Sequence, residues 1–129
     1  DRLTISMQRE LFTNADINTL QQIVTARAPL LKKAFLADSL EAVVTDTTVS
    51  FPWFPFTAEP DDVNAYSTFV TKLCDMARRQ KRVVAVVTET DNDKYAFRCF
   101  LLRLGFIGDE YKIAHKVLLK NLTGNSAFR

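Results

Sequence analysis

The chain has 129 residues, a formal net charge of +2 and 47% hydrophobic residues, with only three glycines and four prolines. These values exclude a disordered or low-complexity protein and fit one domain, residues 1–129, with a buried core. No apolar stretch reaches the length of a membrane span and no secretory signal is visible, so we expect a cytoplasmic protein. The chain starts at Asp1 rather than at methionine, which suggests the C-terminal part of a longer protein.

The N-terminal half predicts three strands and one helix. Apolar and polar residues alternate over 3–8, as in a half-buried strand. A helix follows over 14–31, and Pro29 is expected to divide it because proline removes an amide donor. Residues 40–45 and 48–54 predict two strands joined by a tight turn.

The C-terminal half predicts three helices and a fourth strand. Pro60 and the two aspartates after it start a helix that runs to about residue 79. The valine-rich segment 81–90 predicts a strand covered on both faces. Two further helices are expected over 92–104 and 109–122, separated by the residues GFIG.

The first six elements follow the order β-α-β-β-α-β, which is typical of the ferredoxin-like fold. We therefore predict an α+β domain with an antiparallel four-stranded sheet, the first and third strands at its centre, plus two C-terminal helices. The valines on both faces of the fourth strand indicate that these two helices cover an edge or the second face of the sheet.

Three long strings, VSFPWFP, DKYAFRCFLLRLGFIGDEYK and LLKNLTGNSAFR, resemble the C-terminal part of a bacterial family labelled "virulence-related protein". Its members occur in gut bacteria, often among mobile-element genes. The resemblance implies a bacterial accessory protein. It implies no catalytic or ligand residue, because the family has no established activity.

The residues that carry enzyme chemistry are sparse. His115 is the only histidine, and no phosphate-binding loop, metalloprotease motif or nucleophile elbow is present. Cys74 and Cys99 lie in apolar helical patterns and are expected to be free thiols in a reducing compartment. We therefore expect no cofactor, no metal site and no catalytic residue, although residues from a missing N-terminal region or from an oligomer partner could still complete an enzyme.

Positive charge gathers in the C-terminal part of the chain. Residues 1–77 carry six Lys or Arg and ten Asp or Glu, a net −4, whereas residues 78–129 carry eleven and five, a net +6. Lysines recur every four residues on the last predicted helix, and a basic corner precedes the fourth strand. The candidate nucleic-acid-binding residues are Arg78, Arg79, Lys81, Arg82, Lys112, Lys116 and Lys120.

The two last helices and the glycine between them are similar to a helix-turn-helix. A tight helix-turn-helix usually has a small residue four places before that glycine, but Leu101 stands there. The lysines also lack the mixture of Asn, Gln, Arg and Ser that reads base edges, so any contact would be mainly to phosphates. A solvated helix face is the alternative interpretation of the same lysines.

The segment SFPWFPF, residues 50–56, allows two interpretations. Proline cannot donate to a β-ladder, so we expect the ladder to stop near Phe51 and the rest to form an extended exit from the strand. The aromatic side chains then either pack between the sheet and a helix or form an exposed patch that binds a protein partner. The candidate partner-binding residues are Phe51, Trp53, Phe54 and Phe56.

These observations lead to a predicted function. We expect a non-enzymatic protein-interaction or regulatory module, whose surface combines residues 51–56 with the basic corner at residues 78–82. The alternative is a nucleic-acid-binding accessory protein that uses the basic C-terminal half. A homo-oligomer is compatible with either, and no contact with a membrane is expected.

Overall fold

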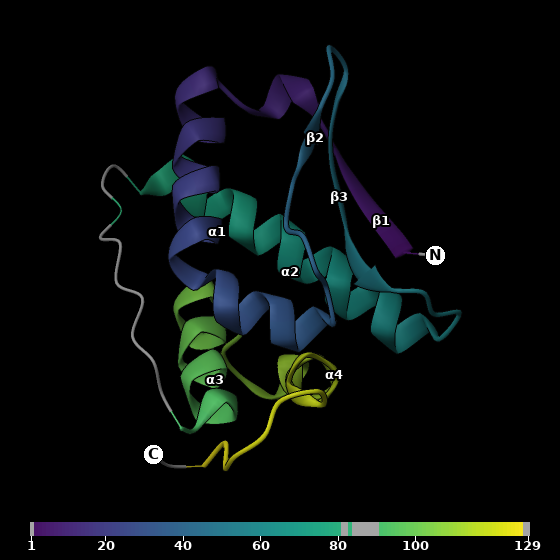
Figure 1. Cartoon of the computed structure of the whole chain (residues 1–129), viewed down its shortest axis with the longest axis vertical. Helices are drawn as coiled ribbons and strands as arrows, with labels where there is room; N and C mark the ends of the chain where they lie inside the picture. The colour runs from purple at the N-terminus through teal and green to yellow at the C-terminus, as the bar shows by residue number, and fades with distance from the viewer. Residues whose placement is uncertain (1, 81–82, 84–90, 128–129) are drawn as a thin grey trace.

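A three-stranded antiparallel sheet packs one face against helices in the computed structural model of the chain, which describes residues 2–80, 83 and 91–127 (Figure 1). The strand order is β1-β3-β2. The strands are β1 (Arg2–Gln8), β2 (Val43–Val44) and β3 (Thr48–Pro55). The helices are α1 (Asn14–Phe35), α2 (Pro60–Arg79), α3 (Asp93–Leu104) and α4 (Lys112–Leu119), with single 3₁₀ turns at Arg9–Leu11 and Asp109–Tyr111.

The α+β class is confirmed, but the prediction of a four-stranded ferredoxin-like sheet is wrong. The part of the chain that the structure describes contributes only three strands, and β1 lies at an edge of the sheet instead of at its centre. Apart from Val83, which is in no strand, the predicted fourth strand (81–90) lies outside the described residues. A valine-rich pattern predicts local strand propensity, whereas a place in the sheet requires a partner strand.

The two C-terminal helices do not cover the second face of the sheet. They contact α1 and α2 instead and lie at the end of the molecule away from the β2–β3 hairpin tip (Figure 1). The uncovered sheet face carries hydroxyl groups: the Ser6 and Ser50 hydroxyls are hydrogen-bonded across β1 and β3 at 2.9 Å. Because this face carries hydroxyl groups, it does not need a covering helix.

The aromatic-proline segment continues β3 to Pro55, contrary to the prediction that the ladder stops near Phe51. Two features accommodate its prolines. The register with β1 shifts between Ile5, opposite Phe51, and Leu3, opposite Phe54, which places Pro52 in a β-bulge. On its other side β3 pairs with β2 only at residues 49 and 50, so Pro52 has no ladder bond to supply there.

Helix α1 is continuous, although Pro29 was expected to divide it. Thr13 begins the helix with a reciprocal capping box: its hydroxyl accepts from the Asp16 amide at 3.0 Å, and its own amide donates to the Asp16 carboxylate at 2.9 Å. Pro29 is exposed, as is Thr25, whose carbonyl loses its helical donor and can be hydrated instead. Both residues lie on the exposed side of the helix, away from the core.

The core lies between the sheet and the helices and is rich in aromatic rings. Phe35 of α1 stands edge-on to Phe54 of β3 and to Phe69 of α2, with ring centroids 4.7 and 5.1 Å apart. Phe54 stacks on Tyr66 of α2 at 4.7 Å, and Phe97 of α3 extends the cluster. One aromatic cluster thus joins the sheet to three helices and holds α3 against α1 through Phe97.

Candidate functional site

An open groove with a volume of about 710 Å³ lies between α3 and α4. Five cationic side chains line it, and we call this surface the basic groove. They are Lys94 and Arg98 from α3 and Lys112, Lys116 and Lys120 from α4. Asp109 is the one acidic residue in its lining.

Helical periodicity places the five cations on facing sides of the two helices. Lys94 and Arg98 are four residues apart, as are the three lysines of α4, so each set forms a row along one helix face. Buried apolar side chains attach both helices to the core, and one of them, Leu119, also lines the groove. These are Phe97, Phe100, Leu101 and Leu104 in α3 and Val117, Leu118 and Leu119 in α4.

The turn between α3 and α4 sets the angle at which the two rows meet. Gly105 ends α3 with a φ of 105°, a left-handed conformation that suits glycine. Phe106 follows and is fully buried, and its carbonyl accepts a hydrogen bond of 2.8 Å from His115 Nε2 on α4. The Lys72 ammonium of α2 lies 4.6 Å from the Tyr111 ring centroid, which adds a cation–π contact just before α4.

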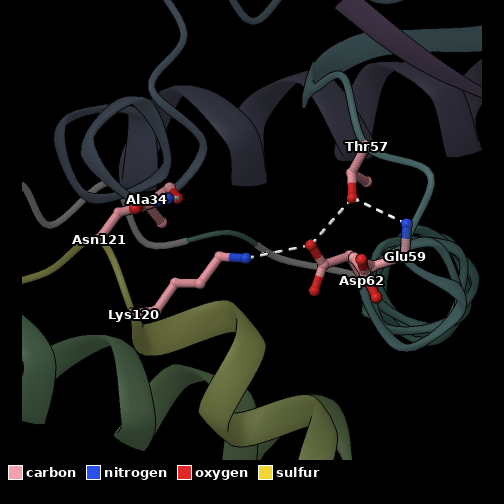
Figure 2. Close-up of polar contacts among 6 residues, drawn as sticks. All are labelled: Ala34, Thr57, Glu59, Asp62, Lys120 and Asn121. Atoms are coloured by element: carbon pink, nitrogen blue, oxygen red, sulfur yellow. Dashed lines mark hydrogen bonds and ion pairs between the residues drawn. The ribbon is translucent and has the colours of Figure 1, made fainter.

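One of the five cations is already paired with a carboxylate. Lys120 Nζ lies 3.1 Å from Asp62 Oδ2 in the first turn of α2, and the same carboxylate oxygen accepts from the Thr57 hydroxyl at 3.1 Å (Figure 2). Next to Lys120, Asn121 donates to the Ala34 carbonyl at 3.0 Å (Figure 2). The end of α4 is thereby attached to both α1 and α2.

The other four groove cations differ from Lys120. Within the described parts of the chain, no carboxylate oxygen lies within 4.0 Å of the charged nitrogens of Lys94, Arg98, Lys112 or Lys116. The groove therefore concentrates positive charge that the described residues do not neutralise. Such a surface can bind phosphate or carboxylate oxygens through charge-assisted hydrogen bonds.

The predicted basic corner lies elsewhere. Arg78 forms an ion pair with Asp75, one turn earlier in α2, and stands over the Phe12 ring at 5.4 Å. Arg79 is exposed at the end of α2. Lys81 and Arg82 lie outside the described residues. Arg78 thus contacts Asp75 and Phe12, which do not line the groove.

The predicted partner-binding residues divide into two groups. Phe51, Trp53 and Phe54 have no exposed area, in agreement with the packing interpretation of the segment, whereas Phe56 is 71% exposed. Phe56 precedes the first turn of α2, and Arg78 lies in its last turn; 20 helical residues separate the two ends by about 28 Å. The structure does not bring the exposed part of the segment and the basic corner together.

Sequence reasoning missed Lys94 and Arg98. The signal was present, because the two residues have the same spacing of four as the lysines of the last helix. What sequence cannot specify is that the α3 row faces the α4 row. That orientation depends on the buried Phe106 and on the left-handed Gly105 in the turn.

Three other features of the described residues bear on metal binding, nucleophilic chemistry and membrane insertion. They hold no group of three or more His, Cys, Asp or Glu side chains close enough to bind one metal ion. Burial raises the pKa of the Cys74 thiol to about 12, so it stays protonated and is a poor nucleophile. None of the helices in the described ranges combines the length and apolar character that a membrane crossing requires.

Comparison with known proteins gave no match among protein-family models, curated proteins or solved structures. The basic groove is therefore the feature that indicates a function. Its distinctive property is two rows of cations on facing helices, four of them without an acidic partner in the described residues.

Proposed function

We propose that the chain is a non-enzymatic nucleic-acid-binding module that holds phosphate groups along the basic groove. The observation that carries the proposal is the pair of facing cationic rows, Lys94 with Arg98 and Lys112 with Lys116. Successive cations in each row are about 6 Å apart along the helix, so a row can follow consecutive phosphates of one strand. Lys120 adds its charge only if it leaves Asp62.

The expected recognition is electrostatic and independent of sequence. Lysine provides a point charge without the paired hydrogen bonds that distinguish bases, and Arg98 is the only guanidinium in the groove lining. Four phosphate contacts predict a slope of about −3.6 in a plot of log affinity against log salt for duplex DNA. Affinity should then fall by about 150-fold between 50 and 200 mM salt.

The test is a titration of a labelled 20-base-pair duplex and of its single strand by fluorescence anisotropy at several salt concentrations. Lys116→Gln should weaken binding and reduce the magnitude of the salt slope by about one unit, because one phosphate contact is lost. Lys32→Gln is the matched control: Lys32 is exposed on α1 and is not part of the groove lining. Equal effects of the two substitutions, or no binding at low salt, would refute the proposal.

A second candidate is a protein-interaction module, and the exposure of Phe56 favours it. A phenylalanine that is 71% exposed beside Pro55 provides an apolar contact for a partner, including a second copy of the chain. Sedimentation velocity over a range of concentrations tests self-association. If the wild-type protein associates and Phe56→Ala does not, this candidate gains support, whereas a monomer at all concentrations rejects self-association.

We place this module in the cytoplasm of a bacterium, as an accessory protein of the family labelled "virulence-related protein". The resemblance of residues 91–129 to that family supports the assignment. Two free cysteines, Cys74 and Cys99, suit a reducing compartment.

A further inference from the structure

The turn between α3 and α4 presents an apolar side chain at the rim of the basic groove. Ile107 is 65% exposed, and its two chain neighbours, Phe106 and Gly108, both line the groove. Lys112, the first cation of the α4 row, follows one turn later. An exposed apolar side chain therefore belongs to the turn that borders the groove, between two residues that line it.

Hydrogen bonds and packing hold the backbone of this turn in place. The Ile107 amide donates to the Gly105 carbonyl at 2.9 Å, which closes a tight turn around Phe106. The Phe106 ring is fully buried against Tyr111, with ring centroids 5.4 Å apart, and its carbonyl is bonded to His115. Because its neighbour is anchored in the core, the backbone of Ile107 needs little ordering when the residue contacts a ligand.

We infer that Ile107 is a wedge that enters between two base pairs of duplex DNA held in the basic groove and bends the duplex. The inference rests on the proposed nucleic-acid-binding function. Proteins that bend DNA insert apolar side chains of this kind, isoleucine among them, into a base step while cations hold the flanking phosphates. The cations beside Ile107 supply the second part of this arrangement.

The exposed β-branched residues of the sheet do not lie beside a basic surface as Ile107 does. Val43 of β2 is 51% exposed, but the chain from Ala34 to Thr71 contains six acidic residues and neither Lys nor Arg. A DNA backbone would be repelled from that region. Val43 is therefore a matched control for the loss of an exposed apolar side chain.

The experiment measures bending by energy transfer between dyes on the two ends of a 30-base-pair duplex with a central TA step, which is easily kinked. We expect the wild-type protein to bend the duplex by about 20° or more. Ile107→Ala should keep the salt slope of the wild-type protein and lose at least half of the change in energy transfer. Val43→Ala should match the wild-type protein in both. Circular dichroism checks that each variant is folded.

The outcomes separate this inference from the proposed function. If the wild-type protein binds the duplex without bending it, or if Ile107→Ala bends it as well as the wild type, the wedge is refuted and the groove proposal stands. If Val43→Ala loses as much bending as Ile107→Ala, the wedge is refuted as well. If the wild-type protein binds only the single strand, the wedge is refuted and the groove proposal stands. If it binds neither the duplex nor the single strand, both proposals fail.

Discussion

Truncation of Trp53 should destabilise the whole protein, because this side chain belongs to the core. Trp53 has no exposed area, stands edge-on to Phe51 with ring centroids 5.0 Å apart, and donates from Nε1 to the Glu41 carbonyl at 3.0 Å. A buried tryptophan replaced by alanine costs about 3–5 kcal/mol of the free energy of unfolding. At an m-value of about 2 kcal/mol per molar, the urea midpoint would fall by about 2 M.

The assay is urea unfolding followed by circular dichroism, because Trp53 is the only tryptophan and its removal eliminates tryptophan fluorescence. Trp53→Phe is a milder second variant that stays measurable if the alanine variant does not fold. It keeps an aromatic ring but loses the hydrogen bond to Glu41, so about 0.5–1.5 kcal/mol of its cost comes from the bond. The exposed Phe56 supplies the control, and Phe56→Ala should change the free energy of unfolding by less than about 0.5 kcal/mol.

Two results would refute this reasoning. A Trp53→Ala variant as stable as the wild-type protein would mean that the aromatic segment is not part of the core. A Phe56→Ala variant as unstable as Trp53→Ala would mean that exposure does not separate the two residues. Binding experiments on either variant are interpretable only after this comparison.

Three further predictions concern stability and charge. Gly124→Ala should lower the free energy of unfolding, measured in urea, by about 2–4 kcal/mol. The φ of Gly124 is 118°, and the new Cβ would lie 3.0 Å from Cγ of Asn92, whose side chain caps α3. A cost no larger than that of Asn92→Ala would contradict the clash. Burial raises the pKa of the Cys74 thiol from 9.0 to about 12. The contribution of this thiol to the free energy of unfolding should therefore be constant below pH 9 and fall by up to about 1.4 kcal/mol per pH unit between pH 9 and 12, where only the unfolded thiol ionises. Cys74→Ala should remove that part of the slope, and identical alkaline slopes in the two proteins would exclude this origin. Asp62→Asn should release Lys120 to the groove, so duplex affinity should rise several-fold and the salt slope should become steeper. Loss of the ion pair should lower the free energy of unfolding by at most about 1 kcal/mol. Unchanged affinity would show that Lys120 does not reach the DNA.

Local signals in the sequence predicted the helices and strands that depend on neighbouring residues. The alternation in residues 3–8, the proline at the start of α2 and the asparagine before α3 each act within one or two turns, and each element is present. The position of Pro29 was misleading because the helix continues through it, with the proline on the exposed side. Propensity alone does not contain that information.

The sequence by itself determined the α+β class, the basic C-terminal half and the two lysine and arginine rows with their spacing of four. Only the tertiary structure decided which of these features meet. A bulge opposite β1 accommodates Pro52 in the central strand, and the strand directs three aromatic side chains into the core, leaving Phe56 outside. The buried Phe106 in the α3–α4 turn orients the two helices so that their cationic rows face each other. Asp62, which is 58 residues from Lys120 in the chain, neutralises one member of the second row. Such pairings depend on contacts between distant residues, which local sequence patterns do not encode.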